Sequence, residues 1–122
     1  MGRDFWLREK QRQRPLAVVE VGGGLESEGA VELHLHCTAL CDAGFTHLVL
    51  DLSAVTFIVS SGVGTLAALT YDILEHGGVF QIAALSEPVI NVIDLLGSRG
   101  FLNIVSDVGE AIARVNNVTV TG

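Results

Sequence analysis

Hydrophobic and polar residues along the chain follow two different periods, which predict strands and helices in alternation. Four short apolar runs rich in branched side chains are typical of strands buried in a parallel sheet. They are residues 16–21, 47–52, 79–85 and 101–105. Segment 5–9 (FWLRE) alternates more weakly and predicts an edge strand, followed by a polar turn at 11–15. The glycines at 22–24 are expected to end the strand 16–21.

Between these runs, apolar residues recur at helical spacing. Leu33, Cys37 and Leu40 form an inward stripe that predicts a helix near 27–42. A second helical pattern begins at Ser60 or Ser61 and is expected to end at the glycine pair 77–78.

Two further helices are predicted from their capping residues. Ser86, followed by Pro88 in the first turn, predicts the start of one helix. Asp107 with Glu110 three residues later resembles a capping box and predicts the start of the last one. The tail, residues 117–122, is expected to fray.

The resulting order is β-β-α-β-α-β-α-β-α. This order predicts an α/β fold, with a mostly parallel, mixed sheet of four to five strands flanked by about four helices. We expect one domain over residues 15–116, preceded by a basic segment at 1–14 that forms the first edge strand and a turn. Functional sites in such folds lie at the carboxyl ends of strands.

Length and composition fit one domain with a sizeable core. The chain has 122 residues, of which 49% are hydrophobic, and its mean hydropathy is +0.50. No apolar run approaches the roughly 18 residues that a membrane span needs. We expect no signal peptide, because the first fourteen residues are basic and lack an apolar stretch.

Charge is distributed unevenly along the chain, with a net charge of −7. Five of the seven basic residues lie within residues 1–14, whereas residues 15–122 hold two basic residues against twelve acidic ones. An acidic body repels nucleic acid phosphates, so direct nucleic acid binding is not expected. The basic segment is either a solvated first strand or a contact for an acidic partner.

The two cysteines suit a reducing cytosol better than a secreted disulfide framework, and predict a cytoplasmic protein. Cys37 and Cys41 lie within one predicted helix. With His34 they could supply three of the four ligands of a zinc site, although one helix rarely provides all of them. Buried thiols and a surface histidine are the simpler interpretation, and no metal or other cofactor is predicted.

The stretch FIVSSGVGTLAAL, residues 57–69, places two serines where a strand leads into a helix. A catalytic serine needs a base and an oxyanion hole. The glycine of the G-x-S-x-G elbow is absent before either serine, and none of the four histidines belongs to a recognisable catalytic motif. Gly62 to Ala67 matches G-x-G-x-x-A, but no acidic residue follows at the end of the next strand, so a nucleotide site is a weak alternative.

A helix start also suits a phosphoacceptor, because backbone N–H groups there can hold a phosphate. The simpler role is that Ser60 or Ser61 caps the helix, which stabilises it by about 1 kcal/mol. The residues by themselves leave both roles open.

Residues 51–66, DLSAVTFIVSSGVGTL, resemble the central signature of STAS domains, the bacterial anti-sigma factor antagonists. The matching positions are Asp51, Leu52, Ser53, Val55, Phe57, Ser60, Ser61, Gly62, Val63 and Gly64. The flanks agree, since GGLESEGAVEL (23–33) and the segments around Gly100 and Asp107 resemble the family's remaining motifs.

The resemblance implies a non-enzymatic switch without a cofactor. Such proteins bind an anti-sigma factor that is also a serine kinase, which releases a sigma factor. The kinase phosphorylates the first serine, here Ser60, and a serine phosphatase reverses this. By the same resemblance, Ser60, Ser61, Gly62 and Val63 form the partner-binding turn.

One departure from the family pattern concerns the residue before the serines. The family's aspartate is Val59 here, which removes a carboxylate beside the acceptor. A STAS module of another assembly, stressosome-like or transporter-associated and without a phosphoswitch, therefore stays an alternative. The oligomeric state, a dimer included, also stays open.

Overall fold

The computed structural model describes residues 4–121, and the burial of side chains over residues 4–116. Ten elements follow one another within residues 4–121. They are β1 (Trp6–Gln13), β2 (Leu16–Leu25), α1 (Ser27–Asp42), β3 (His47–Ile58), α2 (Ser60–Glu75), β4 (Val79–Ala83), α3 (Glu87–Leu95), the 3-10 turn η1 (Arg99–Phe101), β5 (Ile104–Val105) and α4 (Val108–Thr121).

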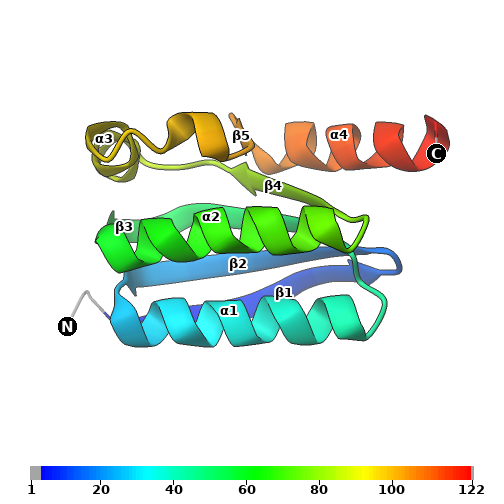
Figure 1. Cartoon of the computed structure of the whole chain (residues 1–122), viewed down its shortest axis with the longest axis horizontal. Helices are drawn as coiled ribbons and strands as arrows, with labels where there is room; N and C mark the ends of the chain where they lie inside the picture. The colour runs from blue at the N-terminus through cyan, green and yellow to red at the C-terminus, as the bar shows by residue number, and fades with distance from the viewer. Residues whose placement is uncertain (1–3, 122) are drawn as a thin grey trace.

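The five strands form one mixed sheet in the order β1-β2-β3-β4-β5. β1 runs antiparallel to β2, and the other neighbours are parallel. Helices α1 and α2 lie side by side over one face, while α4 runs along the β4–β5 side of the molecule (Figure 1). The predicted α/β fold with a mostly parallel sheet and four helices is confirmed.

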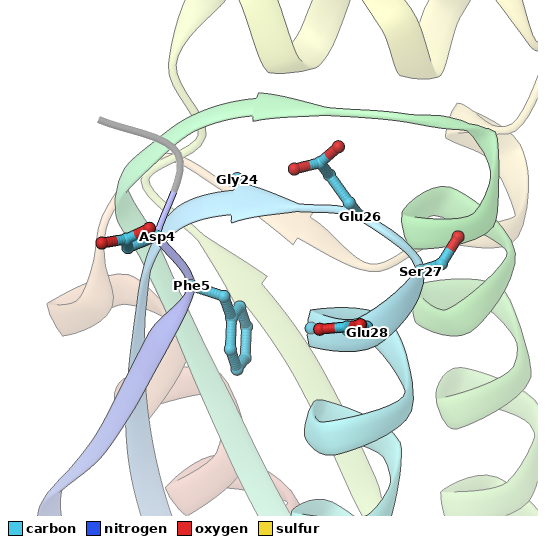
Figure 2. A pocket seen from close by; sticks show the side chains of 7 residues that line it. Asp4, Phe5, Gly24, Glu26, Ser27 and Glu28 are labelled. Atoms are coloured by element: carbon cyan, nitrogen blue, oxygen red, sulfur yellow. The ribbon is translucent and has the colours of Figure 1, made fainter. Parts of the chain in front are cut away.

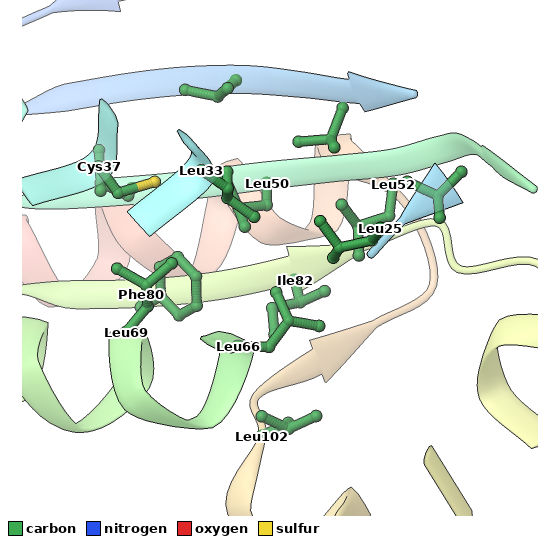
Figure 3. Packing of buried hydrophobic residues seen from close by; sticks show 14 of the residues in the cluster. Leu25, Leu33, Cys37, Leu50, Leu52, Leu66, Leu69, Phe80, Ile82 and Leu102 are labelled. Atoms are coloured by element: carbon green, nitrogen blue, oxygen red, sulfur yellow. The ribbon is translucent and has the colours of Figure 1, made fainter. Parts of the chain in front are cut away.

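The larger part of the core lies between the sheet and the helices α1 and α2. Alternate strand residues such as Val19 and Leu50 point to this side and are fully buried. Figure 3 shows Leu33 and Cys37 of α1 near Leu50, with side chains of α2 packed beside them. The opposite strand residues, such as Val18 and Val49, form a second cluster that Ala111 and Val115 of α4 complete. The stripe Leu33, Cys37 and Leu40 is buried as predicted.

The glycines at 22–24 do not end β2, which was predicted to stop at residue 21. Each glycine makes room for a neighbour that a β-carbon would displace. The Trp6 ring lies against Gly22, the Asp4 carbonyl against Gly23, and the Phe57 ring against Gly24. Gly23 also has a φ of 78°, which favours glycine. The glycines therefore mark close approaches within a continuous strand.

Other element boundaries also differ from the sequence prediction. β1 continues to Gln13, so most of the predicted turn at 11–15 is strand. β3 extends six residues further than predicted, to Ile58. The last predicted strand, 101–105, is reduced to Ile104–Val105, because the η1 turn takes up its first residue. The backbone of α4 continues to Thr121, over most of the segment that was expected to fray, and Gly122 lies outside the described residues.

Two predicted caps hold in modified form. Asp107 accepts a hydrogen bond from the Glu110 N–H at 2.8 Å, while the Glu110 carboxylate accepts one from the Ser106 N–H at 3.2 Å. Ser86 occupies the N-cap of α3, but its hydroxyl donates to the Val55 carbonyl of β3 at 3.4 Å. Among the described residues, no helix is both long enough and apolar enough to cross a membrane.

Most of the described part of the basic N-terminal segment belongs to the sheet, as strand β1. Arg12 forms an ion pair with Glu9 at 2.7 Å, and the guanidinium groups of Arg12 and Arg14 lie 4.7 and 5.1 Å from the centre of the Phe45 ring. The hydrogen bond from Arg12 lowers the pKa of Glu9 below its ordinary value. These contacts favour a structural role for the segment over contact with an acidic partner.

Candidate functional site: the serine turn at the start of α2

The serine turn, residues 59–62, begins α2 at the carboxyl end of β3. Val59 is the N-cap, with extended backbone angles of −113° and 174° and no capping bond from its side chain. Its N–H donates to the Leu25 carbonyl at 3.3 Å, and its carbonyl accepts from the N–H of Gly62 at 2.9 Å. The prediction that Ser60 or Ser61 caps the helix is wrong, because both serines lie inside its first turn.

Both serine side chains are exposed. Within the part of the chain that the structure describes, neither hydroxyl has a hydrogen-bond partner. The two hydroxyls are thus available to an external group.

The two residues after the serines, Gly62 and Val63, are buried. A β-carbon on Gly62 would lie 2.5 Å from the Leu25 carbonyl oxygen and 2.8 Å from Ile58 Cγ1. Val63 is 3% exposed and belongs to the core. Gly62 and Val63 therefore fix the position of the turn from within the core, and their predicted part in the partner-binding turn stays a prediction. Gly64 is exposed, with open space beyond its α-carbon.

Asp51, the first residue of the family-like motif, supports the sheet rather than the serine turn. It is 4% exposed and accepts hydrogen bonds from the Ser53 N–H at 3.0 Å and from Lys10 Nζ at 3.2 Å. Burial alone would raise the pKa of Asp51, but these hydrogen bonds outweigh it and lower the pKa below 3.8. Asp51 thereby links β1 to β3.

An acidic cleft lies beside the serine turn, at the start of α1. It has a volume of about 470 Å³ and is lined by Asp4, Phe5, Gly24, Glu26, Ser27, Glu28 and Gly29. Figure 2 shows these side chains around the end of β2, with Ser27 next to the first turn of α2. Sequence reasoning missed this cleft, although two strand-to-helix turns at neighbouring strands were a usable signal.

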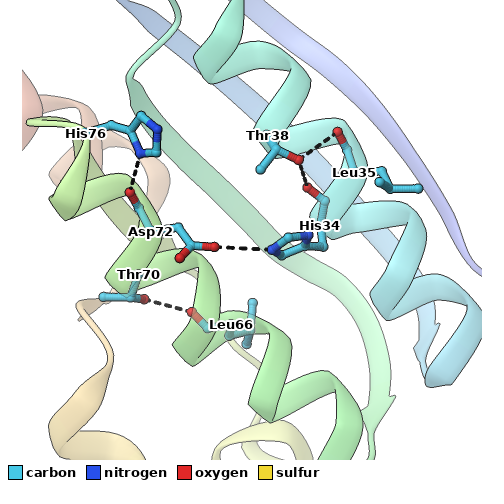
Figure 4. Close-up of polar contacts among 7 residues, drawn as sticks. All are labelled: His34, Leu35, Thr38, Leu66, Thr70, Asp72 and His76. Atoms are coloured by element: carbon cyan, nitrogen blue, oxygen red, sulfur yellow. Dashed lines mark hydrogen bonds and ion pairs between the residues drawn. The ribbon is translucent and has the colours of Figure 1, made fainter.

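The histidines do not supply a base for either serine. His34 pairs with Asp72 at 3.3 Å across α1 and α2 (Figure 4), and His36 lies 3.2 Å from Glu9. His47 begins β3, at the end of the strand opposite the serines. His76 follows the far end of α2, about 24 Å from Ser60 at the helical rise per residue. The arrangement lacks the serine–histidine contact of a hydrolase.

The alternative metal and nucleotide sites also lack support. Within residues 4–116, no three His, Cys, Asp or Glu side chains gather as metal ligands do. Cys37 is buried, which raises the pKa of its thiol to about 12. Gly62 lies inside α2 against the Leu25 carbonyl, whereas the glycines of a dinucleotide fingerprint form an open turn before the helix.

Comparison with known proteins agrees with this architecture. The chain is similar to an anti-sigma factor antagonist from Mycobacterium paratuberculosis, with 25% identity and a TM-score of 0.81 over 95% of this chain and 97% of that one. It resembles the phosphorylated form of the Bacillus cell fate determinant SpoIIAA, with 20% identity and a TM-score of 0.68 over 90% and 99%.

A third similar structure is the murine anion transporter Slc26a9. The identity is 18% and the TM-score 0.73, over 88% of this chain but 18% of that one. Finally, the family model described as the STAS domain matches residues 8–111. Together with the five-stranded mixed sheet and its four helices, this match identifies the chain as a member of the STAS domain family.

Proposed function

We propose that this STAS protein is an anti-sigma factor antagonist. It binds an anti-sigma factor that is also a serine kinase, releases the sigma factor, and loses its partner when Ser60 is phosphorylated. The observation that carries the proposal is the exposed pair Ser60 and Ser61, at the family's motif position, with hydroxyls that have no partner among the described residues.

The division of labour between the two proteins follows from this role. The partner holds the nucleotide and magnesium, so the antagonist acts in the cytoplasm as a non-enzymatic regulator without a cofactor. A serine phosphatase resets the switch.

Electrostatics around the turn explain how one phosphate could end binding. A phosphoserine carries about −1.5 to −2 charges at neutral pH, which docking against a flat surface would desolvate. The basic side chains described within residues 4–116 all have partners elsewhere. They are Arg8 with Glu20, Lys10 with Asp51, Arg12 with Glu9, Arg14 over Phe45, Arg99 with Asp94 and Arg114 with Glu110. Among the described residues, no basic side chain is thus left to neutralise the phosphate, which in this proposal stays at the docking surface.

In this proposal Ser60 remains a phosphoacceptor although Val59 replaces the family's aspartate. The Val59 backbone already has the extended angles of an N-cap, and its N–H donates a hydrogen bond to the Leu25 carbonyl. The missing carboxylate therefore alters recognition by the kinase rather than the position of Ser60.

The test is the affinity for the anti-sigma factor kinases encoded in the same genome, measured by titration calorimetry. Ser60→Glu should weaken binding at least tenfold, whereas Ser60→Ala should stay within about twofold of wild type. Ser61→Glu is the matched control for charge one residue away and should weaken binding less. Equal affinity for wild type and Ser60→Glu would overturn the phosphoswitch and favour a STAS module that docks independently of Ser60.

A further inference from the structure

The edge of the sheet at β5 carries a groove with largely apolar walls. β5 is the last strand in the sheet order and has two residues. Figure 1 shows α3, β5 and α4 together on the side of the molecule away from β1. The groove has a volume of about 240 Å³, and its apolar lining comes from Leu85, Ile90, Ile104 and Val105. A cavity of about 150 Å³ takes a benzene ring, so this groove has room for one aromatic side chain.

The charged side chains that line the groove are already paired. Arg99 donates two hydrogen bonds to the Asp94 carboxylate, at 2.8 and 2.9 Å. The Glu110 carboxylate accepts a hydrogen bond from Arg114 at 3.0 Å. The groove is therefore close to neutral, although the chain carries a net charge of −7. This neutrality favours an apolar occupant over a charged one.

An exposed aromatic side chain lies on the η1 turn, which also contributes Arg99 to the groove. Phe101 is 73% exposed and is the most exposed aromatic side chain in the described part of the chain. Its backbone is held in place, because its N–H donates to the Ser98 carbonyl at 3.0 Å and the next residue, Leu102, is buried in the core. The ion pair between Arg99 and Asp94 also ties η1 to α3. A ring on such a fixed turn loses little conformational freedom on binding.

We propose that two copies of this chain form a two-fold dimer through this surface, with Phe101 of each copy inserted in the groove of the other. A surface that carries a protruding ring and a hollow of matching size is self-complementary, as a two-fold interface requires. Ring and groove are both apolar and close to neutral, so their contact adds no like-charge repulsion to that between two acidic chains.

The size and charge of this interface determine how the dimer behaves. An aromatic side chain buries about 150–250 Å², so two rings and the walls that receive them stay below the roughly 1,200 Å² of lasting interfaces. The dimer is therefore weak and dissociates on dilution. Because the two copies have the same net charge, screening by added salt strengthens the dimer. A contact that depended on opposite charges would weaken instead.

Sedimentation equilibrium of the full chain, produced without its kinase and measured without a partner, tests the proposal in low and high salt. Wild type should approach the mass of a dimer as its concentration rises. Phe101→Ala should raise the dissociation constant of the dimer at least about tenfold, as the loss of a central aromatic anchor does. Tyr71→Ala is the matched control, because Tyr71 is an aromatic residue of α2 that is 63% exposed. It should leave the dissociation constant within about twofold of wild type.

A second variant tests whether the ring enters the groove. Ser106→Trp fills the groove from an exposed position on its lining and leaves Phe101 unchanged, so this variant alone should also lose the dimer. A mixture of Ser106→Trp and Phe101→Ala regains one of the two contacts, because the intact ring of the first chain meets the open groove of the second. The mixture should therefore dimerise more tightly than either variant alone. Melting curves check that every chain is folded.

The opposite results would overturn the proposal. They are a wild-type chain that stays monomeric at every concentration, a dimer that Phe101→Ala leaves intact or that salt weakens, and a mixture that dimerises no better than its components. Assemblies that grow beyond the dimer would show an open head-to-tail contact and overturn the two-fold arrangement. Since neither partner nor phosphate is present, these outcomes are independent of the proposed function of Ser60.

Discussion

The two ends of the sheet differ in how many of their polar side chains have partners within the chain. At the amino end of the parallel strands, Arg12 and Arg14 lie over the ring of Phe45, and Arg12 also pairs with Glu9. At the carboxyl end, α1 and α2 both begin without a side-chain cap, and the serines of their first turns stay exposed. The amino end therefore holds the fold together, while the carboxyl end leaves two helix starts exposed, which is where the proposed function places the partner.

Removing the ring of Phe45, at the amino end of the parallel strands, should have the largest effect on stability. Phe45 is 4% exposed, so Phe45→Ala creates a cavity and removes the surface on which the two guanidinium groups lie. We expect a loss of about 3–5 kcal/mol in the free energy of unfolding, measured by chemical denaturation. Leu95→Ala is the control, since Leu95 is 85% exposed and should change stability by less than about 0.5 kcal/mol. Equal effects of the two substitutions would contradict the claim that the amino end of the parallel strands holds the fold together.

At the carboxyl end of the parallel strands, Gly62→Ala should destabilise the chain by about 1–3 kcal/mol, because the new methyl group meets the Leu25 carbonyl and Ile58. It should also displace the serine turn and weaken partner binding. Gly64→Ala is the matched control, because its β-carbon meets open space within the same helix, and it should stabilise by about 0.4–1 kcal/mol. Urea denaturation of both variants measures this difference in unfolding free energy. A Gly62→Ala chain as stable as wild type would contradict the prediction.

Between the two ends, Asp51→Asn should cost about 1–2 kcal/mol at neutral pH, since Lys10 remains half-exposed to solvent. The pKa of Asp51 is lowered from 3.8 in the folded chain. Its contribution is therefore fully present above the unfolded pKa, and is lost as the pH falls through the lower folded value.

Denaturation of wild type and Asp51→Asn across this acid range tests the contribution of Asp51. The difference in unfolding free energy between the two chains should shrink as the pH falls. A difference that is constant with pH would show that the Asp51 charge does not stabilise the sheet.

The smallest expected effect restores the family's aspartate. Val59→Asp would provide the N-cap carboxylate that α2 lacks, and a cap of this type stabilises by about 1 kcal/mol. Thermal melting should detect the gain, with Val59→Asn as a control that caps without charge. A loss of stability in both variants would show that packing of the Val59 side chain matters more than capping.

Local patterns in the sequence predicted much of the fold. The helical stripe of Leu33, Cys37 and Leu40 placed α1 correctly, and the double serine placed the start of α2 to within a residue. The glycines at 22–24 were misread, because their partners are distant in the sequence: Trp6 lies in β1, Asp4 precedes β1, and Phe57 lies in β3. Sequence pattern gives periodicity within an element, but does not reveal which neighbour occupies the space above a glycine.

At the candidate site, the sequence located the turn but not its surroundings. Ser60 and Ser61 are exposed and Val63 is buried in the core, while the contact of this turn with a partner stays a prediction. The acidic cleft at Glu26 and Glu28 was missed, because it depends on how Asp4 and Phe5, which precede β1, lie against the end of β2 and the start of α1. The packing of one segment against residues about twenty positions further along the chain is a tertiary property that local spacing does not encode.

The most direct test of the switch mixes the purified chain with its anti-sigma factor kinase, with and without the magnesium salt of ATP. Size-exclusion chromatography measures the complex, and fragment mass spectrometry locates the phosphate. We predict a complex without ATP that dissociates as Ser60 becomes phosphorylated, and a Ser60→Ala complex that survives ATP. A complex that persists with Ser60 fully phosphorylated would contradict the central claim that this hydroxyl controls docking.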